Sequence, residues 1–121
     1  MANTFKVINF AAEPNSAGTP FTMYTVASST TTVVLGLVLA NIHTTAVTAE
    51  VELVSTTSNR AGANNAANGT SFLVKDVNIP SGTSLELLSG GKVVLEDGDV
   101  IRIDCSVADK LSGTLSVMEI T

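Results

Sequence analysis

The sequence contains very few of the residues from which enzymes assemble active sites. It has one histidine, one cysteine, one tyrosine and no tryptophan among its 121 residues. With the single histidine, His43, no multi-histidine metal site can form within one subunit, and we expect no Ser-His-Asp or Cys-His constellation. His43 follows an apolar segment and precedes Thr44 and Thr45, which is typical of a turn or interface histidine. We therefore expect a protein that is not an enzyme and has no catalytic, cofactor-binding or metal-binding residue.

Charged residues are also scarce. They make up 14% of the chain, against roughly 25% in typical soluble domains. Six basic residues are scattered among 11 acidic ones, for a net charge of −5. No basic patch is available to neutralise phosphates, so nucleic acid is excluded as a partner. Because a charge-poor surface repels its neighbours weakly, the composition favours a protein that packs against copies of itself or a larger assembly.

Long apolar segments are missing as well. The longest apolar run, 33–42, has ten residues and includes Gly36 and Asn41, whereas a bilayer-spanning helix needs roughly 20. The first ten residues lack a basic region followed by a long apolar one, so they do not predict a signal peptide. We expect no membrane partner.

The single cysteine, Cys105, excludes an intrachain disulfide. It alternates with Ile101 and Ile103 in the sequence. In such a position a free cysteine usually behaves as a small buried hydrophobic residue. We expect Cys105 to be part of the core.

Turn-forming residues divide the segment 76–105 into four short apolar runs. The dividing clusters are Pro80-Ser81-Gly82, Ser89-Gly90-Gly91 and Asp97-Gly98-Asp99. Proline presets φ and glycine accepts positive φ, so each cluster favours a tight reversal of the chain. Runs rich in valine, leucine and isoleucine between such reversals predict a meander of β-strands.

The remainder of the chain also predicts strands. The segment 47–54 has the clearest period of two: its odd positions are apolar and face the core, while Thr48, Glu50 and Glu52 face solvent. Gly36 predicts a bulge or a close backbone approach in its strand. Further strands are expected at 4–10, 21–27, 33–42, 72–79 and 113–120. The strand at 4–10 has apolar residues on both sides, and the almost continuously apolar strand at 33–42 is expected to be covered on both faces.

These elements predict one all-β domain spanning 1–121. The expected architecture is a β-sandwich or jelly-roll-like barrel of about eight short, mainly antiparallel strands. The segment 55–71 is expected to be a long polar loop, for which a short helix over 60–67 is the alternative. Such long loops tend to be functional or mobile.

The acidic cluster Glu96-Asp97-Gly98-Asp99, with Asp104 nearby, has two interpretations. Carboxylates gathered in a loop suit Ca²⁺, whereas Asp97-Gly98 suits a hairpin turn. The turn is favoured because ligands at several spaced positions are absent, and whether Asp97 and Asp99 bind a cation stays open. Two short motif matches are attributed to chance, the sequon Asn68-Gly69-Thr70 and the phosphate-loop-like Gly90-Gly91-Lys92.

Several segments together resemble a family of small structural proteins from tailed-bacteriophage virions. The matching segments are 34–41, 73–76, 79–87, 92–99 and 115–120, including Ile79-Pro80-Ser81-Gly82 and Leu95-Glu96-Asp97-Gly98-Asp99.

The resemblance implies a capsid decoration (cement) protein on the outer surface of a phage capsid. Its partners would be the major capsid protein and further copies of itself, in a homo-oligomer that the resemblance implies is a dimer or a trimer. The N-terminal segment 1–31 or the loop 55–71 would then contact the capsid or a neighbour, because each offers little to an internal core. The alternatives are a collar, tail or fibre-associated virion component, or a carbohydrate- or receptor-binding β-sandwich. The last is disfavoured by an aromatic content of 4%.

Overall fold

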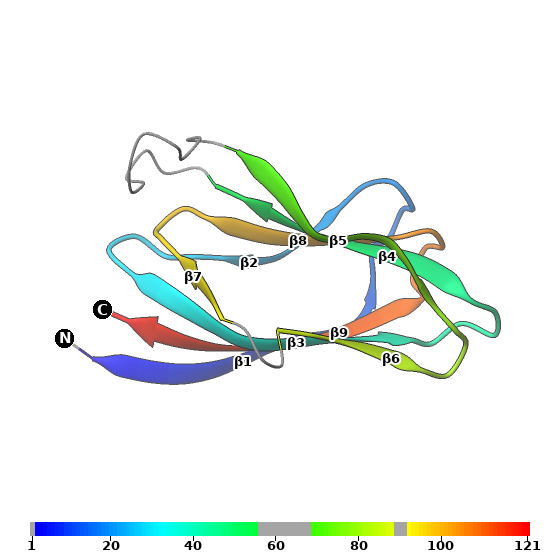
Figure 1. Ribbon diagram of the computed structural model, residues 1–121, viewed down its shortest axis with the longest axis horizontal. Coiled ribbons are helices and arrows are strands. Elements are labelled where there is room, and N and C mark those ends of the chain that lie inside the picture. The colour runs from blue at the N-terminus through cyan, green and yellow to red at the C-terminus, as the bar shows by residue number, and fades with distance from the viewer. Residues whose placement is uncertain (1, 56–68, 89–91) are drawn as a thin grey trace.

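The computed structural model describes residues 2–55, 69–88 and 92–121, and within them it contains nine strands and no helix. Two antiparallel sheets face each other (Figure 1), which confirms the all-β sandwich expected from the sequence. No helix in the described ranges is long and apolar enough to cross a membrane. The strands are β1 (Asn3–Glu13), β2 (Phe21–Thr25), β3 (Thr31–Asn41), β4 (Val47–Val54), β5 (Thr70–Ile79), β6 (Ser84–Leu87), β7 (Val93–Leu95), β8 (Val100–Cys105) and β9 (Leu111–Ile120).

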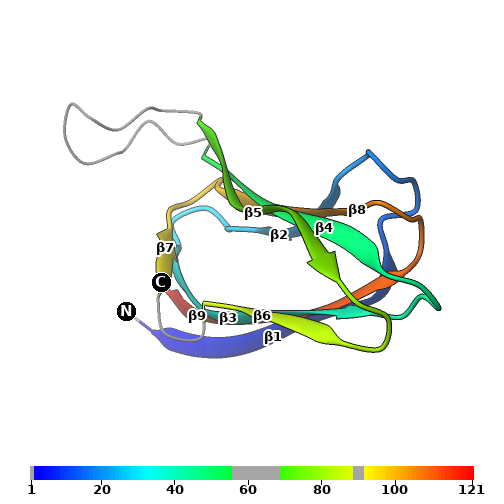
Figure 2. The same ribbon diagram turned by 45° about the vertical axis from the view of Figure 1, so that its right-hand side comes forward.

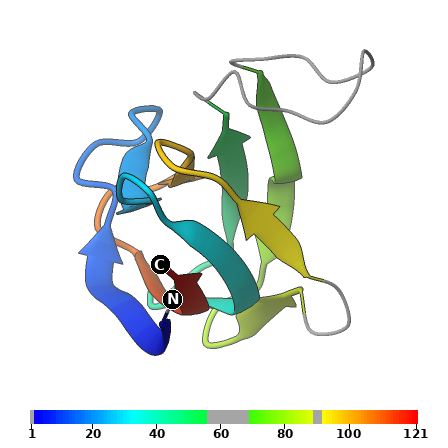
Figure 3. The same ribbon diagram turned by 90° about the vertical axis from the view of Figure 1, so that its left-hand side faces the viewer.

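Strands that are far apart in the sequence lie next to each other in both sheets. The first, which we call sheet A, has the order β1-β9-β3-β6, and β7 also pairs with β3. The second, sheet B, has the order β2-β8-β4-β5. The chain therefore begins and ends on adjacent strands of sheet A, and its two ends lie side by side (Figures 1 and 3).

The predicted meander over 76–105 is wrong in its connectivity. Its strands exist, but β5 and β8 belong to sheet B, whereas β6 and β7 both pair with β3 in sheet A. The turn around Gly98, which has the expected positive φ of 83°, carries the chain from one sheet to the other and is not a hairpin. Turn residues mark where a strand ends, but they do not specify which strand it then joins.

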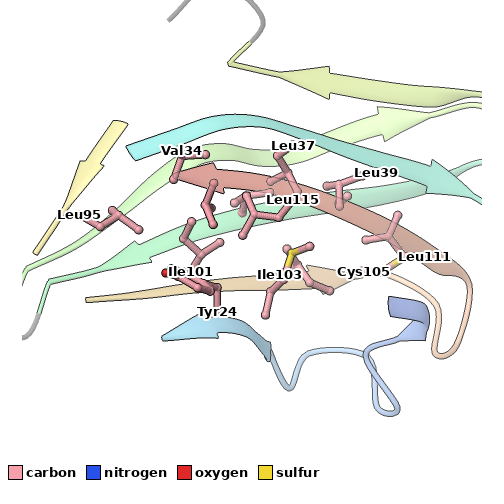
Figure 4. Close-up of a cluster of buried hydrophobic side chains, with 14 of the residues drawn as sticks. Tyr24, Val34, Leu37, Leu39, Leu95, Ile101, Ile103, Cys105, Leu111 and Leu115 are labelled. Atoms are coloured by element: carbon pink, nitrogen blue, oxygen red, sulfur yellow. The ribbon is translucent and has the colours of Figure 1, made fainter. Parts of the chain in front are cut away.

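The core lies between the two sheets (Figures 2 and 4). Valine, leucine and isoleucine side chains alternate into it from both sides, and Cys105 is 3% exposed, as predicted. Gly36 lies at a register shift between β3 and β9, which confirms the predicted bulge. The most completely buried large side chains are Val34, Leu37, Leu39, Leu95, Ile101, Ile103, Leu111, Leu115 and Val117, together with Val47, Val51 and Ile79.

Two expectations about burial need correction. Glu52 was expected to face solvent, but it is only 8% exposed, and Arg102, which lies opposite it on β8, donates hydrogen bonds to its carboxylate. The segment 1–31 was expected to add little to the core, yet Met23, Tyr24 and Val26 are buried in it.

The loop expected at 55–71 overlaps the start of β5, since Thr70 and Ser71 already pair with β4. At its base the N–H of Ser55 donates to the carbonyl of Gly69 at 2.8 Å. Residues 56–68, with the helix alternative at 60–67 and Asn68 of the sequon, lie outside the described residues. The same holds for Ser89-Gly90-Gly91.

Candidate functional site

The acidic residues around Asp97 are separated by the structure. Asp99 is buried, and its Oδ2 accepts the backbone N–H of Glu96 at 3.0 Å. Oδ2 of Asp97 accepts the N–H of Ser29 at 3.3 Å, so these carboxylates fasten the turn and the neighbouring loop. Asp104 lies at the other end of β8, where its Oδ1 accepts the N–H of Cys105 at 2.8 Å. The geometry agrees with a turn, and within the described ranges no three histidine, cysteine or acidic residues are grouped to hold a metal ion.

One shallow hollow of about 200 Å³ on sheet B is lined by three carboxylates, those of Glu50, Asp76 and Asp104. These residues lie far apart in the sequence, and their proximity was not predicted from it. Lys75 lies 3.7 Å from the carboxylate of Glu50 and 3.8 Å from that of Asp76, so its ammonium neutralises part of this charge. The arrangement is a surface ion-pair network of modest energy.

His43 lies in the turn between β3 and β4, as its sequence context predicted. Its backbone N–H donates to Oδ1 of Asn41 at 2.7 Å, and its carbonyl accepts the hydroxyl of Ser81 at 2.7 Å. These bonds involve the backbone of His43, so they give its imidazole no chemical role.

A buried polar network connects the two sheets at Tyr24. The Tyr24 hydroxyl donates to Oε2 of Glu119 at 2.5 Å and lies 2.8 Å from Oγ1 of Thr32. Lys6 Nζ lies 2.7 Å from Oε1 of the same carboxylate. Burial and the bond to Glu119 raise the pKa of Tyr24 from 10.0 to about 12. The bond from Lys6, followed by that from Tyr24, lowers the pKa of Glu119.

The outer face of sheet A carries an apolar stripe that crosses four strands. The register places Phe5 opposite Met118, Met118 opposite Val33, and Val33 opposite Val94. Because opposite residues of neighbouring strands point to the same side, these four side chains form one row on the outside. Phe5 is 71% exposed and Val94 is 54% exposed. This row is called the apolar stripe below.

Two shallow hollows adjoin the stripe and meet at Leu35 and Ser116. One, of about 410 Å³, is lined by Phe5 and Val7 of β1, and the other, of about 400 Å³, is lined by Val38 and Leu87. Val7 is 64% exposed. Apolar side chains therefore continue from the stripe along the surface of β1 and β3.

The outer face of sheet B has a different character. It carries the pair Arg102–Glu52 and the ion pairs of Lys75, whose ammonium lies 4.6 Å from the ring centre of Phe72. On the outer face of sheet A, by contrast, Glu86 is the one charged residue that the strand register places there among the described residues. The sandwich thus has a charged exterior on sheet B and an exterior on sheet A that is poor in charge and carries the apolar stripe.

Sequence reasoning did not find this surface. It recognised that 4–10 has apolar residues on both sides and that 33–42 is almost continuously apolar, but it assigned 33–42 to a strand covered on both faces. The sequence did contain an indication of this surface. A strand with apolar residues on both faces is either packed against other elements on both faces or exposes one apolar face to solvent. Only the strand order shows that β1, β3 and β7 expose theirs on the same side.

Comparisons with known proteins support the fold alone. No protein-family model matches the chain, and no curated protein matches it. A chain from the disulfide-linked pili of Bacillus endospore appendages is 15% identical, with 99% of this chain and 87% of that chain aligned and a TM-score of 0.47. A chain in the structure of infectious bursal disease virus, Gx strain, is 16% identical with a TM-score of 0.50. The alignment covers 98% of this chain and 33% of the viral chain, so the protein spans about a third of that chain and is similar to it in its sandwich of two antiparallel sheets.

Proposed function

We propose that this protein is a structural component of a virion, and specifically a decoration protein that docks on the outer surface of a phage capsid. The observation that carries the proposal is the apolar stripe, with its adjoining hollows, on an outer face where the register places one charged residue, Glu86, among the described residues. Contiguous apolar patches on a soluble protein mark surfaces that bind other proteins. The resemblance of the C-terminal half to phage virion proteins supports the choice of partner.

The two exteriors of the sandwich suit such a role. Phe5, Val7 and Val94 have exposed side chains. Burying each of them against a shell would contribute about 1–3 kcal/mol to the free energy of binding. Many copies that bridge neighbouring capsid subunits would together oppose the internal pressure of the particle. The charged exterior of sheet B would then face solvent, and the net charge of −5 disfavours a position against packaged DNA.

Within the N-terminal segment 1–31, β1 is the part expected to contact the capsid. It belongs to the sheet with the apolar outer stripe, whereas 21–26 contributes to the core. The major capsid protein is therefore expected to contact β1 together with β3 and β7. The loop 55–71 stays a second proposed contact.

The position and copy number of the protein in purified particles test this proposal. Cryo-electron microscopy is expected to show its density repeated over the whole icosahedral shell. Density confined to one vertex would instead assign it to the collar or tail, and absence from particles would remove the virion role.

A matched pair of variants tests which face binds. Phe5→Ser removes the exposed ring from sheet A, and Phe72→Ser removes an exposed ring from the outer face of sheet B. We expect Phe5→Ser to weaken binding to undecorated capsids about tenfold, a change of about 1.4 kcal/mol, and Phe72→Ser to leave it unchanged. The opposite pattern would place the docking face on sheet B.

A further inference from the structure

Among the described residues the two sheets have four free edges, and these edges differ in their protection against pairing with another chain. In sheet B, β2 has five residues and a bulge after Thr22, and β5 has two register shifts as well as Lys75 and Asp76. The far edge of sheet A consists of β6, with four residues, and β7, with three. Short, bulged or charged edges resist pairing.

The remaining edge, β1, has none of these protections along its regular part. It has eleven residues and pairs with β9 without a register shift from Asn3 to Phe10. Its one charged side chain in that part, Lys6, is bound to Glu119 of the same chain. Its Phe5 and Val7 have the largest exposures among the exposed large hydrophobic residues of the described chain. A long, regular edge with exposed apolar side chains is a template for another strand.

The backbone hydrogen bonds at the chain ends define which groups of β1 face this free edge. Ala2 and Thr121 exchange both of their bonds, at 3.1 and 3.0 Å. In an antiparallel ladder, hydrogen-bonded pairs alternate with pairs that are not bonded. Since the register continues unchanged from Ala2, the even-numbered residues bond to β9. The odd-numbered ones, Phe5 and Val7 with Asn3 and Asn9, therefore direct their N–H and C=O groups outward, where none of the described strands pairs with them.

We infer that β1 pairs with β1 of a second copy in antiparallel orientation, so that sheet A continues from one copy into the other. A two-fold axis at Val7 places Val7 opposite Val7 of the second copy and Phe5 opposite its Asn9, and all these residues have outward-facing backbone groups. An axis at Lys6 also matches the backbone groups, but it places two ammonium groups opposite each other, which is unfavourable. Axes at Phe5 or Ile8 pair a shorter part of the regular segment Asn3–Phe10, so the axis at Val7 is the one the geometry supports.

The charge distribution favours a second copy as the occupant of this edge. The first acidic residue of the chain is Glu13, so residues 2–12 contain no carboxylate. Two chains that each carry a net charge of −5 can approach most closely through such a region. Because β1 has no unpaired charge in this region, nothing on it selects a charged peptide. Two copies of β1, by contrast, can pair with each other about a two-fold axis.

The expected dimer is weak in dilute solution. Pairing over Thr4 to Phe10, a span centred on Val7, joins seven residues, or about 23 Å of strand, and so covers less than the roughly 1,600 Å² of a standard interface. Edge pairing leaves the outer face uncovered and brings the exposed Phe5 and Val7 side chains of both copies onto one continuous face. The inference specifies the contact of the homo-oligomer proposed above, but it does not depend on the capsid as a partner.

Amide hydrogen exchange of the purified protein, followed by NMR at two concentrations, tests the pairing directly. At about 1 mM the N–H groups of Phe5, Val7 and Asn9 are expected to exchange at least tenfold more slowly than at about 10 μM. The N–H groups of Lys6 and Ile8, which bond to β9, are expected to be protected at both concentrations. Equal exchange of the odd-numbered groups at both concentrations would overturn the inference.

Sedimentation of three variants separates edge pairing from stacking of the apolar faces. Wild type is expected to move from the mass of one chain, 12.4 kDa, toward twice that mass as concentration rises. Val7→Pro removes an outward N–H without removing a bond to β9, so it is expected to stay monomeric. Val7→Thr keeps the N–H and the branched side chain, and Val94→Lys changes the stripe at the opposite edge, so both are expected to dimerise. A monomeric Val94→Lys beside a dimeric Val7→Pro would mean face stacking and would overturn edge pairing.

Capsid binding by the same variants keeps the two proposals separate. Wild-type protein that dimerises but does not bind capsids contradicts the decoration role alone, and wild-type protein that stays monomeric but binds capsids contradicts edge pairing alone.

Discussion

The hydroxyl of Tyr24 on β2 donates a 2.5 Å hydrogen bond to Oε2 of Glu119 on β9 and so joins sheet B to sheet A. The carboxylate is held from the other side by Lys6 of β1, and the hydroxyl also bonds with the buried Thr32 of β3. Four strands therefore meet in one polar network beside an otherwise apolar core. Buried polar groups of this kind cost free energy unless every member finds a partner.

Tyr24→Phe is expected to lower the free energy of unfolding by about 1–2 kcal/mol. The substitution keeps the ring but leaves the buried hydroxyl of Thr32 and the carboxylate of Glu119 with one bond fewer. Urea denaturation followed by circular dichroism measures the change. Thr32→Val in the Tyr24→Phe background is the control, because removing both hydroxyl groups is expected to recover part of the loss. A double variant less stable than either single variant would contradict this account.

Alkaline titration is expected to place the pKa of Tyr24 near 12. The chain has one tyrosine and no tryptophan, so the absorbance of tyrosinate reports this residue alone. Because the pKa rises from 10.0 to about 12 on folding, the folded state holds the proton more tightly. The resulting stabilisation is fully present below pH 10 and is lost as pH rises toward 12. A titration midpoint near 10 in protein that is still folded would contradict the buried, hydrogen-bonded hydroxyl.

Acid is expected to weaken the same network through Glu119. The hydrogen bond from Lys6, and next that from Tyr24, lowers the pKa of this carboxyl in the folded state below its ordinary 4.5. The unfolded chain then binds the proton more tightly, so this stabilisation is present above pH 4.5 and is lost as pH falls through the folded-state pKa. Denaturation at a series of pH values is expected to show a smaller acid dependence for Glu119→Gln than for wild type.

Lys6→Met is a milder test of the same carboxyl. Because the Lys6 side chain is half exposed, its loss is expected to reduce stability by about 0.5–1 kcal/mol at neutral pH. Added salt is expected to shrink this difference between Lys6→Met and wild type. A difference that is insensitive to salt would mean that packing of the lysine stem, and not its charge, is responsible.

Local pattern predicted the strands well and their partners poorly. The alternation in 47–54 gave a strand with the observed bounds, Val47–Val54, because side-chain period is a property of neighbouring residues. Pairing depends on residues far apart in the sequence, so nothing near Asp97 revealed that this turn crosses between the sheets. The error at Glu52 has the same origin, since its burial follows from Arg102 on an adjacent strand fifty residues away.

The apolar stripe could not be predicted for a related reason. Phe5, Val33 and Val94 each lie in a strand with apolar residues on both sides, and the sequence does not say which side the other sheet covers. Sheet order and register place them in one row. The polar network was also invisible, because Tyr24 and Glu119 are 95 residues apart.

Gly113→Ala is expected to lower the free energy of unfolding by about 1–3 kcal/mol through overpacking. A Cβ atom at this position would overlap the ring of Phe10 on β1 and lie 3.2 Å from Cδ2 of Leu39. The ring cannot move away easily, because it packs edge-on against Phe21 with a centre separation of 5.2 Å. Thermal and urea denaturation measure the effect.

Two controls make this expectation specific. Gly36→Ala adds the same methyl group at a position with no heavy atom within 4 Å, so it is expected to change stability by less than about 0.5 kcal/mol. In a Phe10→Ala background the cost of Gly113→Ala is expected to fall, which a double-mutant cycle detects as coupling. Equal costs in both backgrounds would show that Phe10 is not the obstacle.

Cys105 is expected to react with thiol reagents only when the sandwich opens. Its side chain is 3% exposed and packs in the core between the sheets. Folded domains of ordinary stability expose such a group about 10⁻³ of the time or less, so labelling in native buffer is expected to be about a thousandfold or more slower than in urea. The chain has no other cysteine, so the labelling rate reports one site. Tyr24→Phe and Gly113→Ala are expected to speed labelling in proportion to their loss of stability if Cys105 is exposed by global unfolding. If both variants label at the wild-type rate, the thiol is exposed by a local opening that leaves the Tyr24 network and the packing around Gly113 intact.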